Sequence, residues 1–110
     1  MKTGLVLEGG GMRSLYTAGV LDALLDEKIM ADYVIGVSAG ACCGVSYVSG
    51  QRGRNLRINT VQVQDKRYLG LGNFLKTGSL FGMDFIFDEI PNRIDPFDYE
   101  AFAASPCAFE

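Results

Sequence analysis

The stretch LEGGGMRS, residues 7–14, decides the fold. Its three consecutive glycines stand between an apolar run and the basic Arg13. Glycine costs backbone entropy and packs no side chain, so a triplet needs a structural reason. The apolar run predicts a short buried strand over residues 3–8, and apolar residues at three-to-four spacing predict a helix over residues 14–28. A strand, a glycine turn and a helix start form a pocket of outward-facing backbone N–H groups, and such pockets bind negative charge.

A second strand and helix are predicted further along the chain, over residues 33–37 and from residue 39 to 47 or 48. Two strands joined by a helix of this length form a βαβ unit, so the sheet is predicted to be parallel. The carboxyl ends of parallel strands lie at the same edge of the sheet, where open α/β sheets bind their ligands. The turn after each strand should therefore contribute to one common site.

The turn after the second strand reads GVSAG, which fits the pattern G-x-S-x-G. This pattern is typical of a nucleophile elbow, in which a sharp strand-to-helix turn projects a serine hydroxyl away from the sheet. Ser38 is the serine, and Gly36 and Gly40 stand where neighbouring backbone would come too close for a Cβ. The positive end of the following helix would favour an attacking alkoxide and a developing oxyanion. The alternative for Ser38 is an ordinary helix N-cap.

The later part of the chain is less regular. Residues 51–65 favour a helix over a strand, residues 95–105 predict a short helix, and the last five residues fit the start of another strand. The arginines at 52, 54 and 57, with Lys66 and Arg67, are interpreted as a solvated face rather than an anion site. The phenylalanines from Phe74 to Phe87 are interpreted as core rather than a lipid-binding surface, with incomplete covering. The side chains expected to be partly uncovered are Phe74, Phe81, Phe85, Phe87 and Phe102.

The composition excludes several classes of function. A net charge of −3 gives no general reason to expect nucleic-acid binding. The chain has no histidine, which removes the commonest general base from any mechanism. Its three cysteines show no metal-ligand spacing and are interpreted as reduced, packed residues. No stretch reaches the length of a membrane-spanning helix and no signal peptide is evident, so a cytoplasmic location is expected.

Together, GGGMRS and GVSAGA at this spacing resemble the N-terminal part of the patatin-like phospholipases, especially the bacterial members. The later LKTGSLFGMDFIFDEIPNRIDPFDYEAF is also similar to bacterial members, so the resemblance covers essentially the whole chain. It implies a parallel-sheet, three-layer α/β fold related to the α/β-hydrolases. It also implies that Ser38 is the nucleophile of a Ser-Asp dyad. The oxyanion hole would be formed by Gly9, Gly10, Gly11 and Arg13, with the N–H groups of Gly10 and Gly11 as donors.

Two departures from the family pattern stand out. The glycine motif of the family usually reads G-x-G-x-x-G, and Ser14 occupies the sixth position here, which keeps a small residue in the turn. The family base is an aspartate in a later D-G-[GA] motif, yet none of the eight aspartates of this chain precedes a glycine. We therefore expect residues 1–110 to be the N-terminal part of a single longer domain that ends before the dyad aspartate, and to be catalytically impaired.

Two functions remain open at this point. The first is a serine acyl hydrolase acting on a lipid or acyl ester, and the second is an inactive module that binds acyl groups or a partner. The resemblance implies no cofactor or metal, and it leaves room for peripheral membrane contact. A dinucleotide site is disfavoured because the second strand does not end in an acid. Uncovered apolar surface and an unpaired sheet edge predict self-association, unless these residues are one part of a longer protein.

Overall fold

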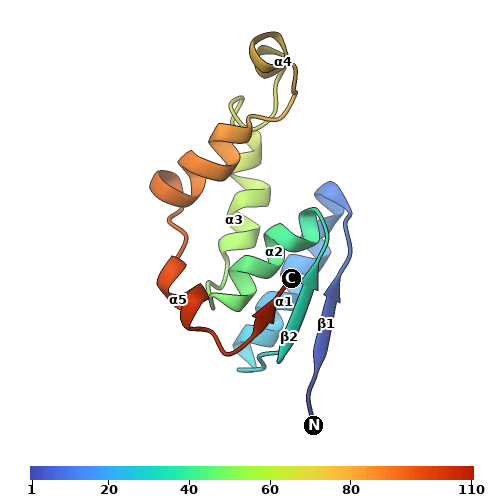
Figure 1. Cartoon of the computed structure of the whole chain (residues 1–110). Helices are drawn as coiled ribbons and strands as arrows, with labels where there is room; N and C mark the ends of the chain where they lie inside the picture. Colours follow the sequence, from blue (N-terminus) through green and yellow to red (C-terminus); the bar gives the residue numbers. More distant parts are fainter. The chain divides into compact units, whose positions relative to one another are not determined.

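The computed structural model describes all residues from 1 to 110, and the chain divides into two compact units (Figure 1). Unit 1 comprises Met1–Leu56 and Asp98–Glu110, and unit 2 comprises the intervening Arg57–Phe97. Unit 1 contains the sheet and both glycine-rich turns, whereas unit 2 is mainly helical.

A parallel sheet of three strands is the framework of unit 1. The strands are β1 (Gly4–Leu7), β2 (Tyr33–Gly36) and β3 (Ala108–Phe109), in the order β1-β2-β3. In this register Leu7 pairs with Gly36, so the carboxyl ends of β1 and β2 lie side by side. The turns that follow these strands therefore start at the same edge of the sheet. The predicted α/β class with a parallel sheet is confirmed, including the strand at the end of the chain.

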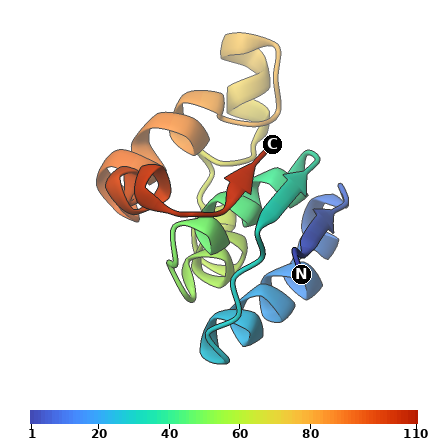
Figure 2. The ribbon, with the colours of Figure 1, turned by 60° about the horizontal axis from the view of Figure 1, so that its bottom comes forward.

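Helices α1 (Ser14–Asp26) and α2 (Ala39–Val48) lie on one side of the strands (Figure 2). Their apolar side chains form a single core with the inward-facing residues of the sheet. The buried members of that core are Leu7, Leu21, Ala31, Val34, Cys43, Tyr47, Val48 and Cys107. The Tyr47 hydroxyl accepts from the Ala31 N–H at 2.8 Å and donates to the Ile29 carbonyl at 2.9 Å, so its polar end is satisfied inside the core. This packing holds the loop before β2 against α2.

The opposite face of the sheet is uncovered. Val6 and Ile35 are register partners, and both are exposed, at 73% and 37% of their surface. Val37 is exposed as well. Parallel sheets are ordinarily buried on both faces, so this apolar face is unusual for an isolated α/β unit.

Unit 2 consists of short helical segments. They are α3 (Arg54–Thr60), which contains the boundary with unit 1, η2 (Gln62–Gln64), α4 (Leu71–Thr77) and the π-helix η3 (Phe85–Ile94). Arg57 donates two hydrogen bonds to the buried Asp95, at 2.6 and 3.0 Å, and so connects α3 with the residue that follows η3. The prediction that residues 51–65 favour a helix over a strand is confirmed by α3. The remaining short helix, α5 (Tyr99–Ala104), belongs to unit 1, and the Asp98 side chain caps it by accepting from the Ala101 N–H.

A second cluster of charges lies around Arg67 in unit 2. Its guanidinium pairs with Asp65 at 2.8 Å and Glu89 at 3.1 Å, and it lies 4.4 Å from the centre of the Phe85 ring. A cation over an aromatic face is favourable, and the contact covers one side of that ring. Phe85 is consequently buried, which corrects the expectation that it is partly uncovered. Phe74, Phe81 and Phe87 are exposed, so the expected exposure is confirmed for these three.

Two further expectations need correction. Arg54 does not lie on a solvated face. It is buried and donates to the Ser46 hydroxyl at 3.1 Å, so a polar partner within unit 1 replaces water. Cys42 is exposed rather than packed, although all three cysteines are free.

Candidate active site

Ser38 occupies the turn between β2 and α2 in a strained backbone conformation. Its φ is 54° and its ψ is −122°, a region that residues other than glycine rarely adopt. The side chain is exposed, and it makes no capping hydrogen bond to α2. An N-cap serine would use its hydroxyl in this way, so the capping interpretation is not supported. Strain at an exposed polar residue is a frequent property of functional sites.

The two glycines of the GVSAG motif allow this turn. A Cβ on Gly36 would lie 2.5 Å from the Cα of Ala41, and a Cβ on Gly40 would collide with the carbonyl oxygens of Leu7 and Glu8. Both obstacles are backbone atoms, which cannot rotate away. The start of α2 can therefore approach the ends of both strands only because these positions lack side chains.

Backbone hydrogen bonds fix the turn at the edge of the sheet. The Val37 N–H donates to the Leu7 carbonyl at 2.9 Å, which continues the β1–β2 ladder by one residue. The Ala41 N–H donates to the Ser38 carbonyl at 2.9 Å and begins the hydrogen bonds of α2. Ser38 is thus held on both sides by regular structure, and its hydroxyl has no hydrogen-bond partner in the chain.

The glycine turn after β1 lies against Ser38. A Cβ on Gly9 would lie 3.3 Å from the Cβ of Ser38 and 3.4 Å from the carbonyl oxygen of Val37. Gly11 has a φ of 54°, a conformation suited to glycine, and it begins the short helix η1 (Gly11–Arg13). The expected convergence of the two turns at one edge of the sheet is therefore observed for Gly9 and Ser38.

The backbone N–H groups of Gly9, Gly10 and Gly11 donate to no acceptor within the chain. The carbonyl of Gly10, in contrast, accepts from the Arg13 N–H at 3.1 Å, which shapes the turn. Uncommitted N–H groups at the start of a helix attract negative charge. The turn can therefore supply hydrogen-bond donors to an anion. Of the three glycines, only Gly9 has a Cβ position within 4 Å of a Ser38 atom.

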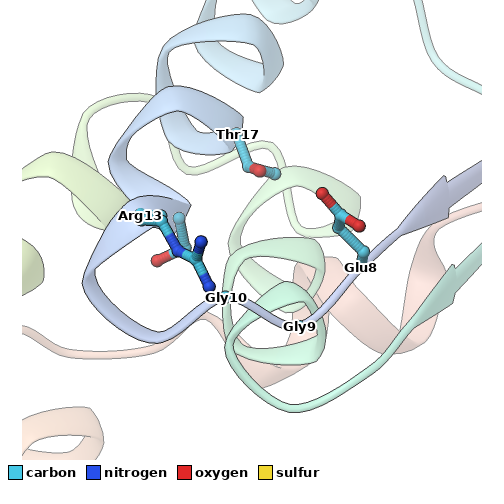
Figure 3. Close-up of a pocket in the computed structure, with 6 residues that line it drawn as sticks. Glu8, Gly9, Gly10, Arg13 and Thr17 are labelled. Carbon is cyan, nitrogen blue, oxygen red and sulfur yellow. The ribbon is translucent and has the colours of Figure 1, made fainter.

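A cavity of about 210 Å³ adjoins the glycine turn on the side of α1 (Figure 3). Its lining residues are Glu8, Gly9, Gly10, Arg13, Ser14 and Thr17. The Glu8 carboxylate, the Arg13 guanidinium and the Thr17 hydroxyl all lie around this hollow (Figure 3). Gly9 belongs to both the cavity and the surroundings of Ser38, whereas Ser38 does not line the cavity. Sequence reasoning missed Glu8 and Thr17, since only the β1–α1 packing brings their side chains together.

The aspartates of the chain form no hydrogen bond with Ser38 and mostly bind other residues. Seven of the eight accept a hydrogen bond from another residue: Asp22 from Gly53, Asp26 from Arg52, Asp32 from Thr3, Asp65 from Arg67, Asp88 from Asn92, Asp95 from Arg57 and Asp98 from Ala101. The remaining one, Asp84, belongs to unit 2. None of them makes a hydrogen bond with Ser38, and no group of three or more histidine, cysteine or acidic side chains gathers as a metal site.

The parallel sheet, the glycine turn and the strained serine between strand and helix define an α/β protein with both turns at one edge of its sheet. The comparisons with known proteins identify the family. The family model of the patatin-like phospholipases matches residues 5–106, and the chain belongs to this family of lipid hydrolases. The resemblance noted in the glycine motifs is thereby confirmed.

One curated relative is the uncharacterized protein YjjU of Escherichia coli (strain K12), which is 28% identical to this chain over 91 residues. The match covers 82% of this chain and 26% of YjjU, so the chain spans about a quarter of the relative's length. No solved structure was found to match the chain. No helix in the chain is both long and apolar enough to cross a membrane.

Proposed function

We propose that Ser38 is the nucleophile of a serine acyl hydrolase that acts on lipid esters. The observation that carries this proposal is the conformation of Ser38. An exposed serine with a φ of 54° lies between a parallel strand and a helix, and its hydroxyl has no partner within the chain. Side chains at Gly36 or Gly40 would collide with neighbouring backbone atoms, and a side chain at Gly9 would crowd Ser38.

In the proposed reaction, the Ser38 Oγ attacks the ester carbonyl carbon and loses its proton to a base. The carbonyl oxygen becomes negatively charged and accepts hydrogen bonds from the N–H groups of Gly10 and Gly11, with Gly9 and Arg13 shaping the turn. The alcohol then leaves with a proton and an acyl-enzyme remains. Water hydrolyses the acyl-enzyme and regenerates the serine.

The proposed base is the dyad aspartate of the family, which residues 1–110 do not supply. No aspartate in the chain precedes a glycine, and none makes a hydrogen bond with Ser38. We propose that these residues are the front part of a longer patatin-like domain, in line with the small share of YjjU that they cover. The second candidate, an inactive acyl-binding or partner-binding module, is favoured by the same lack of a base. The two candidates differ in whether Ser38 is chemically activated by its surroundings.

A fluorophosphonate probe separates these candidates without requiring turnover. The Ser38 Oγ would form a bond to phosphorus, fluoride would leave, and the serine proton would pass to water. The negative charge that develops on the phosphoryl oxygen during this attack would test the glycine turn as an oxyanion site. We expect mass spectrometry to locate the adduct at Ser38, formed at least about tenfold faster in the folded chain than in urea, because oxyanion donors stabilise such charge strongly.

Ser38→Ala should abolish the adduct, while Ser79→Ala, which removes a partly exposed serine of unit 2, should not. Equal labelling in folded and unfolded protein would contradict the nucleophile assignment and favour the binding module. Hydrolysis of p-nitrophenyl esters should remain near the level of Ser38→Ala, since an unassisted serine is a weak nucleophile at neutral pH. Rapid hydrolysis that depends on Ser38 would refute the claim that the base is missing.

A further inference from the structure

We propose that residues 69–83 of unit 2, which we call the apolar tip, dock on the surface of an anionic lipid bilayer. The tip contains α4 and the segments on either side of it. Its large apolar side chains are between 46% and 78% exposed. They are Leu71, Phe74, Leu75, Leu80, Phe81 and Met83, together with Leu69. Several large apolar side chains exposed within one short segment indicate an interaction surface.

The tip is held in a defined shape by its base. Leu69 and Phe81 form an antiparallel bridge, which brings the two ends of the segment together. The Gly70 N–H donates to the Leu80 carbonyl at 2.9 Å, and the Gly82 N–H donates to the Tyr68 carbonyl at 2.9 Å. These bonds clasp the chain below α4, so the apolar side chains are displayed by a closed loop rather than by a loose segment.

One amide at the base strengthens this closure. The Asn73 side-chain nitrogen lies within hydrogen-bond distance of the carbonyls of Lys66, Arg67 and Leu80, at 3.2 to 3.3 Å. Gly82 approaches the Arg67 carbonyl so closely that a Cβ there would collide with it. Asn73 and Gly82 thus keep the base of the tip compact, while the leucine and phenylalanine side chains of the tip remain exposed to water.

Charge favours a bilayer over other occupants. Residues 66–83 contain Lys66, Arg67 and Lys76 and no acid. Arg67 is paired with Asp65 and Glu89, so the cations left for a negatively charged partner are Lys66 and Lys76. Lys66 and Lys76 are exposed and have no ion-pair partner. A second copy of this chain, with a net charge of −3, would offer the tip an apolar surface but few negative charges for its lysines. An anionic bilayer offers both an apolar interior and negative headgroups, the combination that peripheral proteins recognise.

This inference rests on the proposed function to the extent that a lipid esterase must reach lipid. The chain contains no tryptophan, so Phe74→Trp places a single fluorophore at the tip. We expect its emission to shift to shorter wavelength on mixing with vesicles that contain phosphatidylglycerol, and to change little with vesicles of phosphatidylcholine alone. Tyr99→Trp, an exposed aromatic position in unit 1, should show no shift with either vesicle.

In the Phe74→Trp background, Leu75→Glu should lower the vesicle affinity by about tenfold or more, because it places a charge where the tip meets the apolar region of the bilayer. Val61→Glu is the matched control, since Val61 is also an exposed apolar residue of unit 2, at 64%, but lies outside the tip. Lys76→Glu should weaken binding to anionic vesicles by roughly tenfold. Both Leu75 and Val61 are exposed, so circular dichroism should show that each variant folds.

The proposal would be overturned if anionic vesicles caused no shift in the emission of Phe74→Trp, or if Val61→Glu lowered the vesicle affinity as much as Leu75→Glu. It would also be overturned by a blue shift without vesicles, if light scattering showed a higher mass and Leu75→Glu reversed both changes. The last result would identify the tip as a contact between copies. Ser38→Ala should bind vesicles as the parent does. Binding without fluorophosphonate labelling would therefore contradict the proposed function alone, and labelling without binding would contradict the tip alone.

Discussion

Gly9 and Ser38 lie close together at the edge of the sheet: a Cβ added to Gly9 would lie 3.3 Å from the Cβ of Ser38. This distance is tighter than an ordinary van der Waals contact, so a methyl group at residue 9 would push the serine away. Gly9 does not have the positive φ that would make alanine strained there. The contact therefore offers a way to disturb Ser38 with little effect on the fold.

We predict that Gly9→Ala slows formation of the fluorophosphonate adduct at Ser38 by about tenfold or more, because small displacements of a reacting group reduce rates strongly. The free energy of unfolding should change by less than about 1 kcal/mol, because only one side-chain contact tightens. Labelling kinetics and urea unfolding measure the two quantities. An unchanged labelling rate would mean that the glycine turn does not control the serine.

Gly40 should tolerate a side chain far less well than Gly19 of α1 does. Gly40→Ala is predicted to destabilise the protein by about 1–3 kcal/mol or more, because its Cβ would collide with the backbone carbonyls of Leu7 and Glu8. Gly19→Ala in α1 is the control, since Gly19 has open space around its Cβ position. It should stabilise the protein by about 0.5–1 kcal/mol through helix propensity. Urea unfolding that gives both substitutions the same sign would contradict the close approach of α2 to the strands.

The ion pair between Arg67 and Asp65 predicts a measurable pH effect in unit 2. Hydrogen bonds from Arg67 lower the pKa of the Asp65 carboxyl from 3.8 to about 2. Because the pKa is depressed in the folded state, the stabilisation is complete above about pH 4 and is lost as the pH falls toward 2. Carboxyl NMR should find a pKa near 2 for Asp65, and Arg67→Gln should return it toward 3.8. A normal pKa in the parent protein would show that the pair does not persist in solution.

Self-association is expected through the uncovered face of the sheet. Val6 and Ile35 present adjacent apolar side chains there, and β1 is an edge strand. Light scattering of the parent chain should give a mass above 11.9 kDa, and Val6→Glu should lower it. Leu75→Glu should leave this mass unchanged, because the tip is proposed to meet lipid. A monodisperse, cooperatively folding parent monomer would contradict both the association and the proposal of a longer domain.

The N-terminal half of the fold was predictable because its elements follow simple periodic patterns. The strands at residues 3–8 and 33–37 and the helices after them match β1, α1, β2 and α2 to within one or two residues at each end. The glycines at 36 and 40 could be interpreted because close backbone approach is a common reason for glycine at such positions. The contact between Gly9 and Ser38 followed from the edge that parallel strands share.

Unit 2 was harder to predict because its side chains are placed by irregular structure. Phe85 is buried by a π-helix and by the guanidinium of Arg67, and neither appears as a period in the sequence. Arg54 is buried because Ser46, eight residues earlier, offers a hydroxyl to its guanidinium. The cavity beside Arg13 likewise depends on how α1 packs beside β1. Each of these features needs a tertiary contact that no local pattern contains.

The pairing of Tyr33 with Ala108 has a consequence for biosynthesis. The segment that pairs with the second edge of β2 is synthesised only after all of unit 2. At ordinary rates of translation, β2 would wait several seconds, on the order of ten, with one edge unpaired. During that time the nascent chain exposes a hydrogen-bonding edge beside apolar residues, which is the form that chaperones and neighbouring chains capture. Faithful production of this protein should therefore depend on translation speed and chaperone supply more than its size suggests.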